Sequence, residues 1–388
     1  MKRRTEFLPF GRPDFSGGEI EAVSAVMRSG WVGMGPETIA FEQELARYTG
    51  ATRMVTVNSC TSALFLSLLV NGIGPGDEVI CPSLTWCSTA NVALYLGARV
   101  VFCDVDPGTL CVTPETVQEK LSPRTRAVMV VHMGGLAADV DSIRAVLPKE
   151  VALIEDAAHA LGARYADGSM VGSSGNLACF SFYANKNLST GEGGAVAVQD
   201  PEMAEHFVSL RLHGLSSDAW KRFTHPATAL TPALTELGYK MNYTDLQAAI
   251  GRVQLRRQGE FARRRLEIAL RYHDRLSAEF PELTFQHGVT HDHHARHLFL
   301  VLLPRSEYFS LSRNDILLAL RDRNIGASIH YAPLHTMPLY ADMNRQGLPY
   351  TEDVSQRLLT LPISGSMSLK DADDVLDAFV DILQTAKR

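Results

Sequence analysis

The stretch from Leu177 to Gln199, LACFSFYANKNLSTGEGGAVAVQ, contains two short apolar runs that enclose a polar, glycine-rich loop. In both runs most apolar residues follow one another instead of alternating with polar ones. This pattern is typical of strands that are covered by helices on both faces of a sheet. The loop between the runs carries one lysine, Lys186. The stretch therefore predicts two buried strands with a charged side chain near their edge.

Runs of the same kind recur upstream, with helix-like segments such as TSALFLSLLV and STANVALYL between them. This β-α-β rhythm predicts an α/β large domain with a mainly parallel, seven-stranded sheet flanked by helices. In such sheets, ligands bind beyond the carboxyl ends of the strands. The five further candidate strands are Met54 to Val57, Glu78 to Pro82, Arg99 to Val105, Ala127 to His132 and Val151 to Asp156.

The C-terminal third has a different pattern. From Thr244 to about Phe280, apolar residues recur at helical spacing without a proline, which predicts one long connecting helix. Beyond it, HLFLVLLP, NDILLALRDR and ADDVLDAFVDILQTA indicate a smaller α+β domain. We therefore expect residues 1–255 to form an N-terminal segment and the large domain, and residues 256–388 to form the small domain.

Composition narrows the class of protein. The 388 residues are 46% apolar, enough for about two domains. The net charge of −6 is spread without long single-sign blocks, which argues against a nucleic-acid partner. Neither a run of the ~20 apolar residues that a membrane span needs nor a signal-peptide core is present, so we expect a cytoplasmic protein without a membrane partner. Six cysteines without a CxxC pair indicate neither disulfides nor a metal site.

Two charged residues stand at predicted strand ends. Asp156 closes the run VALIED just before AAHALGA, where it could cap a helix or pair with a cationic group of a ligand. Its neighbour Glu155 should face the opposite side of the sheet. Lys186 could be an ordinary solvated loop residue. It could also form a Schiff base with a carbonyl compound, if desolvation or nearby positive charge lowers its pKa.

Two further motifs suit the same kind of ligand. In VNSCTSALFLSLL, hydroxyl groups lead into an apolar helix, and a helix N-terminus attracts a phosphate, although simple capping would need the same residues. Trp86 in PSLTWCSTA follows a strand and could be a core residue or stack on an aromatic ring. A phosphate site, a stacking surface, a carboxylate and an amine together match pyridoxal phosphate, whose protonated ring nitrogen needs a carboxylate partner.

Longer motifs of the chain resemble those of a known protein family. GWVGMGPETIAFE, PSLTWCSTANVALYLGARVVFCDVD, LIEDAAHALGA, CFSFYANKNLSTGEGG, LGYKMNYTDLQAAIG and SIHYAPLHTMPLY resemble the successive signatures of the nucleotide-sugar aminotransferases, the DegT/DnrJ/StrS group of fold-type I pyridoxal phosphate enzymes. The resemblance runs from about Pro9 to Leu361. It implies a homodimer with composite active sites, L-glutamate as the amino donor and a nucleoside-diphosphate keto sugar as the acceptor.

The resemblance also implies roles for the cofactor residues. Lys186 would form the Schiff base and shuttle the proton, and Asp156 would pair with the pyridinium nitrogen. Trp86 would stack on the ring. His159 would lie near the cofactor's 3′ oxygen, whereas without the resemblance it would be a core or helix-face histidine. The phosphate would be bound by Thr61, Ser62 and Ser181.

One motif departs from the common pattern of the group. Many members have an asparagine that reaches the phosphate of the other subunit, and here Lys240 holds that position with Asn242 two residues later. Either residue could make the contact.

The sugar would be faced by Trp31, His330, Tyr331 and His335. Without the resemblance, the histidines would be surface residues and the tryptophan a packing anchor.

Local likeness to the UDP-4-amino-4-deoxy-L-arabinose aminotransferase favours amination at C4 of a 4-keto sugar carried by UDP or dTDP. A C3-keto sugar or keto-inositol aminotransferase of the same family is the nearest alternative. The dehydratase branch has a histidine in place of Lys186 and is disfavoured. A non-catalytic regulatory protein that keeps the fold is the alternative of a different class.

Overall fold

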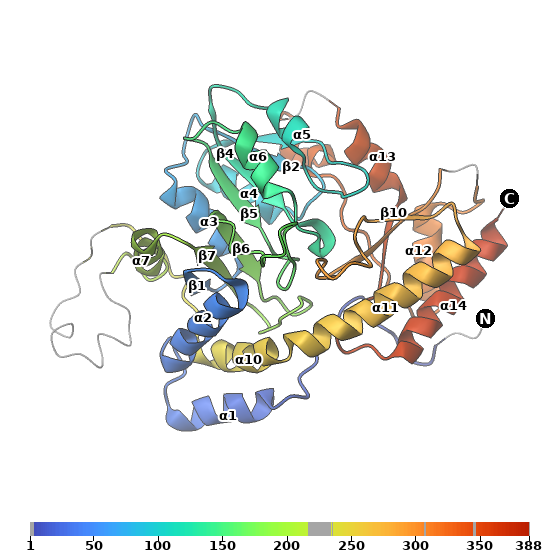
Figure 1. The fold of residues 1–388 in the computed structure, drawn as a ribbon, viewed down its shortest axis with the longest axis horizontal. Helices are drawn as coiled ribbons and strands as arrows, with labels where there is room; N and C mark the ends of the chain where they lie inside the picture. The colour runs from blue at the N-terminus through green and yellow to red at the C-terminus, as the bar shows by residue number, and fades with distance from the viewer. Residues whose placement is uncertain (1–3, 216–233, 235, 306–307, 344–346, 388) are drawn as a thin grey trace.

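The computed structural model describes residues 4–215, 234, 236–305, 308–343 and 347–387 (Figure 1). Its centre is a seven-stranded sheet in the order β1-β7-β6-β5-β4-β2-β3. Strand β7 runs antiparallel to β1 and β6, and the other neighbouring pairs are parallel. The mainly parallel α/β sheet is therefore confirmed. Its strands are β1 (Arg53–Val57), β2 (Glu78–Pro82), β3 (Arg99–Cys103), β4 (Thr125–Val131), β5 (Ala152–Asp156), β6 (Leu177–Ser181) and β7 (Gly194–Val198).

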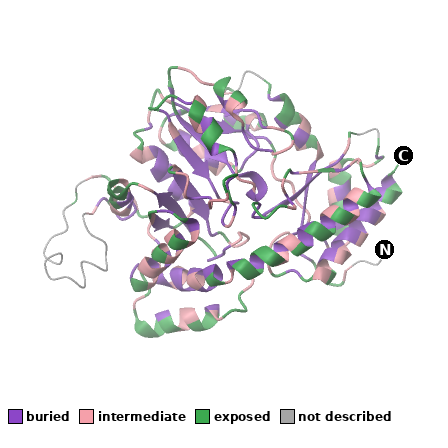
Figure 2. Ribbon diagram, viewed as in Figure 1, coloured by how far each residue is buried: buried purple, intermediate pink, exposed green. Residues whose placement is uncertain are grey.

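Helices cover both faces of this sheet, and Figure 2 shows its strands as almost wholly buried. Successive strand residues belong to opposite apolar clusters: Val79 and Met129 to one, Ile80 and Val130 to the other. This is the reason for the continuous apolar runs, because both sets of side chains are buried. The helices that precede, connect or directly follow these strands are α1 (Glu19–Ser29), α2 (Pro36–Thr49), α3 (Cys60–Val70), α4 (Ser88–Tyr95), α5 (Pro114–Gln118), α6 (Val140–Val146) and α7 (Pro201–Leu210).

The C-terminal part builds a second core around an antiparallel sheet of order β10-β9-β8. Helix α14 lies along α11 and packs with α12 (Figure 1). None of the helices in the described ranges is long and apolar enough to cross a membrane. The division between residues 255 and 256 stays a prediction. The elements of this part are α10 (Asp245–Arg256), α11 (Gln258–Glu279), β8 (Thr284–Phe285), β9 (Phe299–Leu302), α12 (Arg313–Asp322), α13 (Pro349–Arg357), β10 (Leu358–Leu361) and α14 (Leu369–Ala386).

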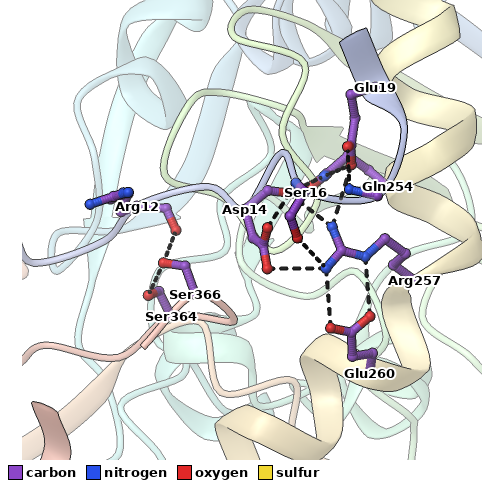
Figure 3. A network of polar contacts seen from close by, with 10 residues as sticks. Arg12, Asp14, Ser16, Glu19, Gln254, Arg257, Glu260, Ser364 and Ser366 are labelled. Carbon is purple, nitrogen blue, oxygen red and sulfur yellow. Dashed lines mark hydrogen bonds and ion pairs between the residues drawn. The ribbon is translucent and has the colours of Figure 1, made fainter. Parts of the chain in front are cut away.

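The predicted single helix from Thr244 to Phe280 is wrong in one respect, because it is broken at Arg257, which has φ −92° and ψ 1°. The side chain of Arg257 holds the N-terminal segment at this break (Figure 3). Its guanidinium lies 3.0 Å from Asp14, 3.1 Å from Glu260 and 3.6 Å from Glu19. It also donates to the Ser16 hydroxyl. The break therefore coincides with a polar contact between segments far apart in the sequence.

Removing the Arg257 side chain should destabilise the protein. Glu19 is only 3% exposed and would lose the cation beside it. Loss of one partner of a buried ion pair lowers the free energy of unfolding by about 3 kcal/mol. Because Arg257 is partly exposed, we expect Arg257→Ala to lower it by about 2 kcal/mol. The urea midpoint measures this loss. Arg264→Ala removes an exposed pair with Glu267 and should change stability by under about 0.5 kcal/mol; equal midpoints would contradict the prediction.

Candidate active site

Asp156 ends β5 at the carboxyl edge of the sheet, where it pairs in register with Cys179 on β6. The helix that the capping alternative for Asp156 requires does not form, because residues 157–163, all of them described, make a series of turns. Ala157 donates its N–H to the carbonyl of Cys179, and Gly162 has φ 92°. Asp156 is therefore not a helix cap, and its carboxylate is available for another partner.

Neighbouring groups hold the Asp156 carboxylate in place. One oxygen accepts a hydrogen bond from the Thr89 hydroxyl at 2.7 Å, and the other accepts from the Ala158 N–H at 3.2 Å. Burial raises the pKa of Asp156, and the Thr89 hydrogen bond and the Lys186 charge act against this rise. The sequence reasoning missed Thr89, because a threonine in the first turn of a helix carries no distinctive signal.

Glu155 faces the other side of β5, as the alternation of strand side chains predicts. Its carboxylate lies 2.8 Å from Nε2 of His132 and accepts hydrogen bonds from the Tyr165 hydroxyl at 2.6 Å and the Asn176 amide at 2.9 Å. The backbone N–H of Ala138 donates to Nδ1 of His132, so the ring proton lies on Nε2 and points at Glu155. This buried network anchors the strand that presents Asp156.

Lys186 lies in the loop after β6 and is partly buried, with its N–H bonded to the Tyr183 carbonyl. Its Nζ lies 3.4 Å from Nε2 of His297. Burial lowers the pKa of Lys186 to about 8, although the nearby Asp156 carboxylate acts in the opposite direction. The amine is therefore not an ordinary solvated lysine, and it is available as a nucleophile near neutral pH.

Aromatic and imidazole rings gather on the same side of the site. Trp86 is 60% exposed, and its ring centroid lies 5.9 Å from that of Tyr331. The Tyr331 hydroxyl lies 3.0 Å from Nε2 of His159. The His159 ring in turn lies 4.6 Å from the ring of His297. Burial is the main reason that the pKa values of both histidines are well below their usual range, so both rings are neutral at pH 7.

The predicted phosphate residues converge on the N-terminus of α3. Ser59 caps this helix by accepting the N–H of Ser62, and the first turn contains no acidic residue. Ser181 pairs with Gly194 across β6 and β7. A Cβ at Gly194 would lie only 2.5 Å from the backbone nitrogen of Cys60, so glycine permits the close approach of β7 to the helix end. Ser181 thus comes close to the positive end of α3, where Thr61 also lies.

His330 and His335 lie on the segment that faces the sheet from the C-terminal part. Nδ1 of His330 is 2.9 Å from the Thr360 hydroxyl, and burial lowers the pKa of this histidine to about 3. His335 has a different environment, with Nδ1 2.7 Å from the Ser83 hydroxyl and Nε2 3.4 Å from Glu352. These contacts tie the segment to the loop after β2.

Trp31 lies at the other end of the N-terminal segment, in a groove between α1, α2 and α10. Its indole N–H donates to the Met34 carbonyl at 3.0 Å. The Lys240 amine donates a hydrogen bond to the side-chain carbonyl oxygen of Asn242. The carbonyl of Met241 between them accepts the N–H of Asn58 at 2.9 Å, which places this pair beside the α3 end.

The chain matches the DegT/DnrJ/EryC1/StrS aminotransferase family over residues 13–380. It belongs to this family. The spore coat polysaccharide biosynthesis protein SpsC of Bacillus subtilis (strain 168) is 41% identical over 391 residues, covering 100% of each chain. The crystal structure of the aminotransferase TlmJ from Streptoalloteichus hindustanus has a TM-score of 0.89 and 36% identity, covering 98% of this chain and 99% of that chain. Spr1654 from Streptococcus pneumoniae in its PLP form has a TM-score of 0.88 and 28% identity, with the same coverage.

This member of the DegT/DnrJ/EryC1/StrS family is a sugar aminotransferase that uses pyridoxal phosphate. The chain's own residues fit that cofactor. Asp156 presents a buried carboxylate, Lys186 a nucleophilic amine and Trp86 an exposed aromatic face. Within the described ranges, Nδ1 of His159 is buried without a hydrogen-bond partner, an arrangement that a ligand oxygen would satisfy.

The lowered pKa of Lys186 predicts how the protein takes up its cofactor. Only the neutral amine attacks the aldehyde, so the rate of loading onto cofactor-stripped protein should rise with pH and be half-maximal near pH 8. The growth of the cofactor's visible absorbance band measures this rate. A midpoint near 10.5, the usual pKa of lysine, would contradict the prediction.

Proposed function

We propose that the enzyme transfers the amino group of L-glutamate to the 4-keto carbon of a keto-deoxy sugar or pentose linked to UDP or dTDP. The observation that carries amino transfer is the joint placement of Lys186 and Asp156 at one edge of the sheet, with each charge affecting the other's pKa. The likeness of PSLTW, IEDAAHA and GYKMN to the arabinose-type enzyme supports the C4 position. The name of SpsC, which concerns polysaccharide biosynthesis, is in keeping with a sugar acceptor.

When bound, pyridoxal phosphate supplies an electron sink for the carbon that loses or gains a proton. Lys186 would hold the cofactor covalently between turnovers and, once released, would move the proton. Asp156 would keep the ring nitrogen protonated by its negative charge. Trp86 would stack on the ring, and His159 would donate toward the 3′ oxygen. The phosphate would be bound by Thr61, Ser62 and Ser181.

We assign the sugar to the side of His330 and Tyr331. Burial lowers the pKa of His330 to about 3 and raises that of Tyr331, so both groups stay neutral at pH 7. Neutral donors and acceptors suit a sugar's hydroxyl and keto groups without competing with Lys186 for the proton. His335 is proposed to contribute by holding this segment against Ser83.

The active unit is proposed to be a homodimer with composite sites. Lys240 and Asn242 form a polar pair on a partly exposed loop, suited to a phosphate of the other subunit. Trp31 is proposed to reach the partner's sugar site from the groove beside α10. Sedimentation of the loaded enzyme tests the dimer, and a monomer with full activity would refute the composite site.

Half-reaction spectroscopy tests the substrate assignment. Glutamate should convert the loaded enzyme to its amino form, with loss of the visible cofactor band. Addition of UDP- or dTDP-linked 4-keto sugars should restore the band, whereas 3-keto sugars and keto-inositol should not. Recovery with a 3-keto sugar or keto-inositol alone would favour the nearest alternative. A protein that never develops a cofactor band would favour the non-catalytic one.

A further inference from the structure

We propose that His297 is a further catalytic residue, whose Nε2 accepts a hydrogen bond from the Lys186 amine and holds that amine while it carries the substrate proton. The inference rests on the proposed role of Lys186 and adds a partner for it. His297 stands just before β9 and is 2% exposed. Its Nε2 lies 3.4 Å from Nζ of Lys186. Hydrogen bonds of this kind are often long without substrate and shorten when it binds.

The contacts of Asn187 assign the tautomer of His297. The side-chain amide of Asn187 donates from Nδ2 to the Ala295 carbonyl at 2.9 Å, and this carbonyl can only accept. The other end of the amide, Oδ1, is therefore an acceptor, and it lies 3.3 Å from Nδ1 of His297. Nδ1 must then carry the ring proton. Nε2 is left with a lone pair that faces Lys186.

The segment before His297 is held rigidly. Ala295 donates its N–H to the Gly135 carbonyl at 2.8 Å, which docks the segment on the loop after β4. Arg296 has φ 50°, a left-handed conformation that is rare for a residue with a side chain. Its guanidinium donates to the carbonyls of Val289 at 2.8 Å, His294 at 2.7 Å and His291. These bonds stabilise the unusual backbone that orients the His297 ring, as is often found at functional sites.

A neutral acceptor at this place suits the proton transfer. As the substrate C–H bond breaks, the lone pair of Lys186 would form the new N–H bond, and the electron pair of the broken bond would stay with the carbon, for which the cofactor would supply the electron sink. The resulting ammonium needs an acceptor that stabilises it without removing its proton. The titratable groups around His297 are Lys186, His159, His330 and Arg265. Burial of the ring is the main reason that the pKa of His297 lies well below its usual range, and the charges of Lys186 and Arg265 act in the same direction. Lys186 itself is also faced by Asp156 and Cys60.

Two substitutions separate this role from packing. His297→Phe keeps a ring but removes the acceptor, and His297→Gln restores an acceptor oxygen. In His297→Phe the ammonium form of Lys186 loses a stabilising bond, so the midpoint for cofactor loading onto stripped protein should move to lower pH. With saturating glutamate, kcat of His297→Phe should be about 10-fold to 100-fold below that of the wild type, because proton transfer becomes slower. For the same reason, the isotope effect on kcat with α-deuterated glutamate should be larger than in the wild type. His297→Gln should recover most of both properties.

His293→Gln is the matched control, since His293 is an exposed histidine of the same segment. It should leave the loading midpoint, the isotope effect and kcat unchanged. The proposal is overturned if His297→Phe keeps the wild-type midpoint and isotope effect, whatever its kcat, or if His297→Gln fails to recover them in a folded protein. Failure of the function itself would appear instead as a Lys186→Ala protein that still turns over.

Discussion

Lys186→Ala is expected to lower kcat by at least about 10⁴-fold, since the proposed function makes Lys186 both the covalent attachment of the cofactor and the group that moves the substrate proton. The visible absorbance band that reports attachment to the lysine should also be lost. The change removes a long side chain from a partly buried loop position, and the Asp156 carboxylate keeps its hydrogen bonds from Thr89 and Ala158, so the fold should be retained. Single-turnover kinetics with glutamate and absorbance spectra of the loaded protein measure the two effects.

Lys149→Ala is the matched control, because Lys149 is exposed in the loop before β5. It should keep wild-type turnover and spectrum. An amine added to the solution could replace part of the proton transfer in Lys186→Ala, whereas it should do nothing for the control. A Lys186→Ala protein with a normal spectrum and measurable turnover would remove the basis of the proposed function and of the role assigned to His297.

Asp156→Asn is expected to lower kcat by about 10²-fold to 10³-fold, the range observed when one preorganised electrostatic partner is removed from an active site. The amide has nearly the shape of the carboxylate and can still accept the Thr89 hydroxyl. It lacks the negative charge that holds a proton on the ring nitrogen. Cofactor affinity should fall as well, which a titration of stripped protein would show.

Asp200→Asn tests the same chemical change away from the site. Asp200 caps α7 by accepting the N–H of Glu202, and asparagine is an equally good cap. Turnover and affinity should therefore be unchanged. If Asp156→Asn behaved like Asp200→Asn, the carboxylate would be a structural residue, and another group would have to hold the ring proton.

The seven central strands were predictable because each is buried on both faces and so reads as an unbroken apolar run. One helix prediction was wrong, and one alternative that required a helix was excluded, where distant contacts overrode local preference. AAHALGA has good helix-forming residues, but Ala157 bonds to β6 and Gly162 adopts a left-handed turn. The long helix after Thr244 is interrupted where Arg257 contacts Asp14 and Glu19. A pattern of residues along one segment cannot report such partners.

The residues of the candidate site also divide into those that could be predicted from the sequence and those that could not. Asp156 and Lys186 were recognisable because each stands where a strand ends, and parallel strands bring such ends to one edge of the sheet. Thr89 and His297 were not recognised, because their importance depends on hydrogen bonds to residues 67 and 111 positions away. The place of His335 at the sugar stays a prediction; in the structure its ring lies 2.7 Å from the Ser83 hydroxyl and 3.4 Å from Glu352.

By itself, the sequence determined the α/β sheet and the lysine and aspartate at the strand ends, because burial and strand order leave marks along the chain. Its motifs, through their resemblance to known enzymes, indicated the aminotransferase family. Only the tertiary structure decided which side chains surround that lysine. Through the hydrogen bonds of Asn187 to Ala295 and His297, it directed the Nε2 lone pair of His297 toward the Lys186 amine. It also lowered the pKa of Lys186 by burial. Desolvation and hydrogen-bond direction depend on distances between segments, and these arise only when the chain is folded.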